Sequence, residues 1–298
     1  GFDFAIIQGI PGFYGQFGYF YSIPLENHIN LYFHMIPTCD ASYSFRLAEP
    51  DDIPFLMEED ESYQARYSFS ALRSEAKWNY MLTESLKTEY GSEFWIMESK
   101  ESGEKFYCRI PAEGFGEGLI VSEISEGISP PALEALFVFF KEKAQKRDKP
   151  YIRLNLHYES TAGRMALKLG AKEGRPYAWQ IKIPDTIRFL KSIAQVLEKR
   201  IKASSFNAYT GTFRLDFYKK SVDMIWENGR LKSVREGDGE SDGSFNISAH
   251  LFPALALGHR NWQELRHIHP DIFIGSAESA LFIETLFPKA LSWIHEQY

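Results

Sequence analysis

Two segments of this chain share one plan, and this repeat constrains the fold more than any other feature of the sequence. Residues 4–25 (FAIIQGIPGFYGQFGYFYSIPL) and 152–184 (IRLNLHYESTAGRMALKLGAKEGRPYAWQIKIP) each read as strand, break, short helix, glycine, and a strand that ends at proline. Gly18 matches Gly170, and a glycine at this place ends a helix in the left-handed conformation. The second copy follows a domain-length segment and the first does not. We therefore expect a tandem repeat whose first member lacks its front half.

Length and charge exclude several classes of protein. A chain of 298 residues predicts two or three domains. The net charge of −7 argues against a nucleic-acid partner, because proteins that bind the phosphate backbone carry a basic surface. The longest apolar run, residues 135–140, is far shorter than the roughly 20 residues of a membrane helix, so we expect no membrane partner. Cys39 and Cys108 lie far apart without CxxC spacing, which favours a reducing, cytoplasmic setting.

Local patterns predict the elements between and around the two copies. Besides the strand 4–7 and the helical turn 13–17, we expect strands at 19–24, 28–36, 44–47, 94–98, 105–110, 119–124, 151–156 and 178–183. Helices are expected from Asp51 or Asp52 onward and at 71–90, after Pro130, and at 161–169. The stripe Leu133, Leu136, Phe137 and Phe140 is interpreted as core.

After Pro184 the pattern changes to that of a separate α+β region. Apolar residues at helical spacing predict one helix over 187–201, and Asn228–Gly229 predicts a two-residue hairpin turn between two alternating segments. The acidic stretch REGDGESDGS is expected to be a solvated loop. Short helices are expected at 250–258, 262–267 and 278–286.

The stretch GIPGFYGQFGYFY resembles the closing segment of Gcn5-related N-acetyltransferases. Two such units followed by an α+β domain are similar to the enhanced-intracellular-survival (Eis) type of these enzymes. That resemblance implies an α+β fold in three parts: residues 1–40 as the tail of a first acetyltransferase domain, 41–184 as a second acetyltransferase-like domain, and 185–298 as a sterol-carrier-protein-like domain.

The resemblance also implies an activity, the transfer of an acetyl group from acetyl-CoA to the primary amine of a small molecule or peptide. Tyr14 matches the family's tyrosine that returns a proton to the coenzyme A thiolate, and the pKa of a phenol lies near that of a thiol. The α-carboxylate of Tyr298 would match the terminal carboxylate that serves as general base. We therefore expect Tyr298 to be ordered and close to Tyr14.

The family holds the coenzyme A pyrophosphate on backbone N–H groups of a basic, Gly-rich loop at a helix N-terminus. In the second domain the corresponding stretch is SEISEGISPPAL, residues 122–133. Here Glu123 and Glu126 would repel phosphate, and Pro130 and Pro131 lack the N–H donor. In the first domain the loop would precede Phe4. We therefore expect no coenzyme A site in the second domain and a truncated first domain, for which both an active and an inactive form stay open.

Other features favour structural roles. Phe13 and Phe17 are interpreted as core aromatics, and the His157–Ser160 pair as a surface imidazole and a helix cap. HIHPD, residues 267–271, lacks a further histidine at diagnostic spacing, so no metal site is expected. GFGEG, residues 114–118, leads into a strand and is interpreted as a turn.

Two functional hypotheses from different classes stay open. The first is the N-acetyltransferase. The second is a non-catalytic binding or assembly module whose carrier-like domain holds an apolar ligand or a protein partner. In either case the strand 4–7 must pair, because an unpaired apolar strand edge leads to aggregation. The second domain or another copy of the chain would cover this edge, and we therefore expect a homo-oligomer.

Overall fold

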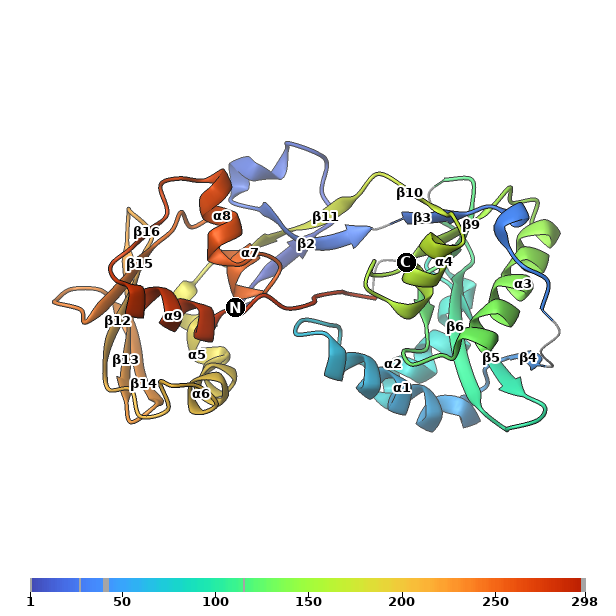
Figure 1. Ribbon diagram of the computed structural model, residues 1–298, viewed down its shortest axis with the longest axis horizontal. Coiled ribbons are helices and arrows are strands. Elements are labelled where there is room, and N and C mark those ends of the chain that lie inside the picture. The colour runs from blue at the N-terminus through green and yellow to red at the C-terminus, as the bar shows by residue number, and fades with distance from the viewer. Residues whose placement is uncertain (1, 27, 40–42, 115, 296–298) are drawn as a thin grey trace. The chain divides into compact units, whose positions relative to one another are not determined.

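The computed structural model describes residues 2–26, 28–39, 43–114 and 116–295. The chain forms two compact units, and each unit combines separate segments of the sequence (Figure 1). Unit 1 consists of residues 1–23 and 178–292, and unit 2 of residues 24–177 and 293–298. The domain boundaries at 40/41 and 184/185 were predicted from the resemblance to a family and not from compactness. They stay a prediction.

Unit 2 carries two four-stranded sheets in the part of the chain that is described. The first has the order β4-β5-β6-β8, from β4 (Tyr43–Leu47), β5 (Ser92–Ser99), β6 (Lys105–Pro111) and β8 (Glu123–Ile124). The second has the order β10-β3-β9-β7, from β10 (Lys172–Glu173), β3 (His28–Leu31), β9 (Ile152–Asn155) and β7 (Leu119–Val121). The α-helices are α1 (Ile53–Arg66), α2 (Glu75–Thr83), α3 (Pro130–Lys146) and α4 (Thr161–Lys168).

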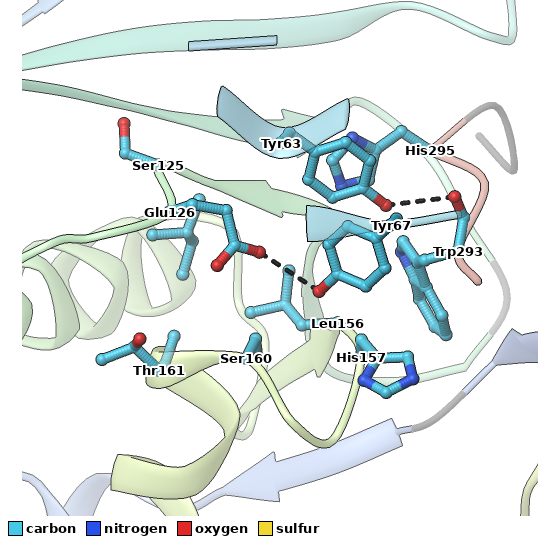
Figure 2. Close-up of a pocket in the computed structure, with 12 residues that line it drawn as sticks. Tyr63, Tyr67, Ser125, Glu126, Leu156, His157, Ser160, Thr161, Trp293 and His295 are labelled. Atoms are coloured by element: carbon cyan, nitrogen blue, oxygen red, sulfur yellow. Dashed lines mark hydrogen bonds between the residues drawn. The ribbon is translucent and has the colours of Figure 1, made fainter. Parts of the chain in front are cut away.

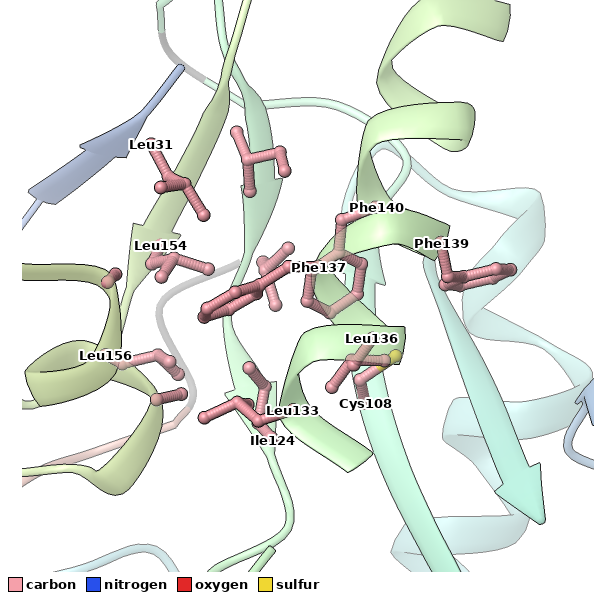
Figure 3. Packing of buried hydrophobic residues seen from close by; sticks show 14 of the residues in the cluster. Leu31, Cys108, Ile124, Leu133, Leu136, Phe137, Phe139, Phe140, Leu154 and Leu156 are labelled. Carbon is pink, nitrogen blue, oxygen red and sulfur yellow. The ribbon is translucent and has the colours of Figure 1, made fainter. Parts of the chain in front are cut away.

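The main core of unit 2 lies between α3 and the sheets (Figure 3). The predicted stripe of α3 is fully buried there, against Leu31 of β3, Cys108 of β6 and Leu154 of β9. Burying each side chain of this size contributes about 2 kcal/mol. A second cluster, built on Leu56 of α1 and Trp78 of α2, covers the opposite side of β5 and β6. The sheet that contains β5 and β6 is therefore covered by helices on both faces.

Unit 1 contains a five-stranded sheet and a three-stranded sheet within the described residues. The larger sheet has the order β14-β13-β12-β15-β16, from β12 (Gly211–Asp216), β13 (Ser221–Glu227), β14 (Arg230–Glu236), β15 (Gly243–Asn246) and β16 (Phe273–Ile274). Its helices are α5 (Thr186–Ser192), α6 (Ala194–Lys202), α7 (Phe252–Ala256), α8 (Trp262–Ile268) and α9 (Ala277–Leu286). The smaller sheet has the order β1-β11-β2, from β1 (Ala5–Ile7), β11 (Tyr177–Lys182) and β2 (Phe20–Glu26).

Strands of the two copies pair with each other. In the smaller sheet of unit 1, β11 from the second copy lies between β1 and β2 of the first. In unit 2, β3, which follows the first copy, lies between β9 and β10 of the second. Strand β11 runs antiparallel to β1, and β3 runs antiparallel to β9. Gly18 and Gly170, at φ +81° and +95°, each follow the short helix of their copy, as the sequence repeat predicts.

Most predicted elements are present, and the differences have local causes. The strand predicted for 28–36 ends at Leu31, because Leu31 pairs with Ile152, the first residue of its antiparallel partner β9, and a 3-10 turn follows. The helix predicted for 71–90 is only α2, since the Ser85 hydroxyl bonds to the Met81 carbonyl and competes with the helical ladder.

Three further predictions need correction. The helix expected over 187–201 is divided into α5 and α6 at Ile193. The strand expected over 119–124 is divided at Ser122, where the chain leaves β9 and pairs with β6. The end of the predicted acidic loop forms β15, which pairs in parallel with β12. In the described part of the chain no helix has the length and apolar character to cross a membrane.

Candidate functional site

A gap opens in unit 2 where two parallel strands separate (Figure 2). Leu119 to Val121 pair in register with Ile152 to Leu154, and then β8 turns to pair with β6 instead. The gap is lined by Ile124, Ser125 and Glu126 on one side and by Leu156 and His157 on the other. The carboxyl ends of parallel strands are where open α/β sheets commonly bind ligands. This gap is therefore the place in unit 2 to look for a site.

The end of the chain fills much of this gap. Trp293 and His295 line it together with Tyr63 of α1, with Tyr67 directly after α1, and with the first residues of α4 (Figure 2). The volume left open is about 10 Å³, which is the space that one water molecule needs. A pantetheine chain does not fit into this space.

A buried charge cluster lies beside the gap. Glu123 has no exposed surface, and its carboxylate accepts hydrogen bonds from Arg73 at 2.7 and 2.8 Å, from Arg109 at 2.7 Å and from Tyr107 at 3.0 Å. His295 Nδ1 lies 3.7 Å from the same carboxylate. Burial alone would raise the pKa of Glu123, but Arg73, His295 and Arg109 outweigh it and hold that pKa well below its usual range. The carboxylate is thus ionised and fully engaged.

The phenols and the imidazole of the gap have fixed protonation states near neutral pH. Burial raises the pKa of Tyr63 and of Tyr67, so both hydroxyls are donors. Tyr63 donates to the Trp293 carbonyl at 3.1 Å, and Tyr67 to Glu126 at 3.1 Å. Burial and the charge of Arg66 lower the pKa of His157 to about 4, and its Nδ1 accepts a hydrogen bond from the Glu159 N–H. At pH 7 the Tyr63 and Tyr67 phenols are therefore protonated and the His157 imidazole is neutral.

Tyr14 lies in unit 1, on a one-turn 3-10 helix that begins at Tyr14 and ends at Phe17. Its ring contacts Phe13, Phe17 and Tyr19 at centroid distances of 5.1, 6.4 and 6.2 Å. A Cβ at Gly9 would collide with the Tyr14 ring, so the ring can pack at this position only because residue 9 has no side chain. Tyr14 is half-buried, which leaves it accessible.

Three interpretations from the sequence need correction. Phe13 and Phe17 contact each other but are 46% and 51% exposed, so they are surface residues and not core. His157 is buried and not a surface imidazole, whereas Ser160 is the predicted cap and accepts from Gly163 N–H at 3.0 Å. Glu123 was expected to lie in a loop and repel phosphate. It belongs instead to strand β8, and its carboxylate is paired with arginines.

Two other sites can be placed only in part. Tyr298 lies outside the described residues, so its expected proximity to Tyr14 stays a prediction. His269 of HIHPD contacts His250, with ring centroids 6.0 Å apart. No group of three or more potential metal ligands lies together among the residues that the structure describes.

Sequence reasoning missed the two arginines of the charge cluster beside the gap, Arg73 and Arg109. Both arginines are buried, and Arg109 interrupts the otherwise apolar strand FYCRIP. A charge within a buried strand requires a partner of opposite charge, and this was the signal available. The partner, Glu123, and the tail residue His295 are remote in sequence, so the signal could not name them.

The sequence matches no protein-family model, and no curated protein is significantly similar to it. Solved structures do share its fold. A GCN5-related N-acetyltransferase from Kribbella flavida is 13% identical with a TM-score of 0.64, over 99% of this chain and 70% of that one. One from Anabaena variabilis is 12% identical, with a TM-score of 0.62 over 98% and 72%. A conserved protein from Enterococcus faecalis described as a probable N-acyltransferase is 14% identical, with a TM-score of 0.60 over 97% and 69%.

This chain therefore has the fold of Gcn5-related N-acetyltransferases over nearly its whole length. Eis1 from Mycobacterium abscessus is also similar, at 11% identity and a TM-score of 0.50 over 98% of this chain and 72% of that one. Identities this low establish the fold, and the chemistry has to be argued from residues.

Proposed function

We propose that this protein is an N-acetyltransferase that transfers the acetyl group of acetyl-CoA to the primary amine of a small molecule or peptide. The observation that carries the proposal is the fold similarity to acetyltransferases over 97–99% of the chain. The repeated strand–helix–glycine–strand plan supports it, because the first copy contains Tyr14 at the position of the family's proton donor.

The proposed reaction is direct attack. The neutral amine nitrogen forms a bond to the acetyl carbonyl carbon, and the bond from that carbon to the coenzyme A sulfur breaks. Tyr14 supplies a proton to the thiolate, and the ammonium proton leaves to a base. We assign the base to the α-carboxylate of Tyr298, whose usual pKa of about 3.3–3.7 requires partial desolvation or a relaying water.

We place the acetyl-CoA of this chemistry beside Tyr14, its proton donor, and not in the gap of unit 2. Helix α3 begins with Pro130 and Pro131, so its first two positions offer no N–H donor to a pyrophosphate. The gap beside it has about 10 Å³ of open volume. In the proposed arrangement, residues 41–184 are a non-catalytic acetyltransferase-like domain and 185–298 a sterol-carrier-like domain.

The test is turnover by the full-length gene product with acetyl-CoA and a panel of primary amines, followed through release of the coenzyme A thiol. Tyr14→Phe is expected to lower kcat by roughly 100-fold, the usual contribution of a general acid, with little change in the KM for acetyl-CoA. Tyr21→Phe, an exposed tyrosine on β2, is the matched control and should leave kcat unchanged. No turnover with any amine and no heat of acetyl-CoA binding would refute the proposal.

The alternative is a non-catalytic module that holds an apolar ligand in the carrier-like domain. One cavity in this region is lined by Tyr209, Phe213 and Phe282 and measures about 50 Å³. Ligand sites for molecules of drug size are roughly 300–1,000 Å³. This cavity is too small for a sterol or an acyl chain, so we favour the enzyme.

A further inference from the structure

The last described residues of the chain are bound in the gap of unit 2 through their backbone. The N–H of Trp293 donates to the Phe69 carbonyl at 3.0 Å, and the Trp293 carbonyl accepts from the Tyr63 hydroxyl at 3.1 Å. The carbonyl of His295 accepts from Arg109 Nη1 at 3.0 Å. Groups of unit 2 thus form hydrogen bonds with the main chain of the segment, as peptide-binding sites do.

Two side chains anchor the same segment. Trp293 is 2% exposed, and its indole meets the His157 ring edge to face at 5.8 Å. The imidazole of His295 lies over the Tyr63 ring at a centroid distance of 3.8 Å (Figure 2). Ile294 between them is only partly buried. Trp293 and His295 are therefore two buried anchors, separated by one partly buried residue.

The charge cluster serves this segment as well as the sheet. Arg109 donates to Glu123 and to the His295 carbonyl, so one guanidinium connects the strand β8 with the tail. A hydrogen bond from a charged donor to a buried carbonyl is stronger than a neutral one. The tail therefore completes the surroundings of a buried arginine, and its removal would leave that bond unmade.

We propose that the gap of unit 2 is a peptide-binding site, and that its ligand is the chain's own C-terminal segment Trp293–His295. The segment occupies the strand divergence of a domain whose α3 N-terminus lacks the donors for a pyrophosphate. The site binds the segment through three main-chain hydrogen bonds, and it recognises the Trp-x-His sequence through the two buried aromatic side chains.

The test is hydrogen exchange of the intact protein, measured by mass spectrometry on the fragment that contains residues 293–295. We expect these amides to be protected in the wild type. Trp293→Ala and Tyr63→Phe should each accelerate their exchange, Tyr63→Phe by about five- to tenfold, which corresponds to one buried hydrogen bond. Tyr80→Phe, an exposed tyrosine on α2, is the control and should change nothing.

The fragment containing α3 serves as the internal standard of folding, because its core does not include the tail. Unprotected amides at 293–295 in the wild type would overturn the proposal, and so would unchanged exchange in Tyr63→Phe with α3 intact. A second arm adds 1 mM acetyl-CoA, about the top of the usual substrate KM range. Tail exchange should not respond, and acceleration would show that the gap is a cosubstrate site that the tail merely covers.

Discussion

Glu123 is a fully buried carboxylate between two arginines, and its replacement tests how much the cluster stabilises unit 2. In Glu123→Gln the guanidinium groups of Arg73 and Arg109 lose their shared carboxylate. Removing one partner of a buried ion pair costs about 3–5 kcal/mol, because a buried charge remains uncompensated. We expect a loss of this size in urea unfolding, against less than about 0.5 kcal/mol for the exposed Glu101→Gln. Equal stability of the two variants would show that the cluster does not hold the fold.

His157 predicts the acid sensitivity of the same unit. Its pKa is about 4 in the folded protein because of burial and Arg66, and about 6.5 in an unfolded chain. Between these values the unfolded state binds more protons, so this contribution is complete above pH 6.5 and is lost as the pH falls toward 4. The difference amounts to about 3 kcal/mol. We expect His157→Gln to flatten the dependence of unfolding free energy on pH in that window, with exposed His34→Gln as the control.

The hairpin at Asn228–Gly229 is an element that the sequence predicted correctly, because a two-residue turn of this kind needs positive φ at both positions. The observed φ values are +50° and +72°. The helix predicted over 187–201 was divided at Ile193, since the apolar stripe continues across the break and periodicity cannot detect it. Local chemistry thus predicted turns and caps better than the lengths of helices.

Gly229 and Gly103 form a matched pair for testing this turn. Both have φ +72°, so alanine at either position pays the same left-handed strain of about 1–2 kcal/mol. A Cβ at Gly229 would also collide with the Asn207 carbonyl oxygen, whereas a Cβ at Gly103 meets no atom within 4 Å. We therefore expect Gly229→Ala to lower the unfolding free energy by clearly more than Gly103→Ala. Equal losses in thermal unfolding would mean that residue 207 moves aside freely.

The repeat in the sequence predicted two related segments, but it could not show that strands of one copy pair with a strand of the other. Antiparallel pairing of β11 with β1 joins residues about 175 positions apart, as in the register Ile6 with Ile181. The apolar pattern of a strand is the same whether the strand pairs within its own copy or with the other copy. For the same reason the gap of unit 2 was not foreseen, because it is assembled from α1, β8, the loop after β9, and the chain end.

Unit 1 exposes large apolar side chains near its first strand, and this supports the expected homo-oligomer. Ile10, Phe13 and Phe17 are 64%, 46% and 51% exposed, and Phe13 contacts Phe17. Clustered apolar surface of this kind marks an interaction site. We expect light scattering at micromolar concentration to give a multiple of 34.4 kDa for the 298-residue chain, and Phe13→Ser with Phe17→Ser to lower that mass. Leu72→Ser, at 82% exposure in unit 2, is the control and should leave the mass unchanged. A wild-type mass equal to one chain would rule out this surface as a contact between copies.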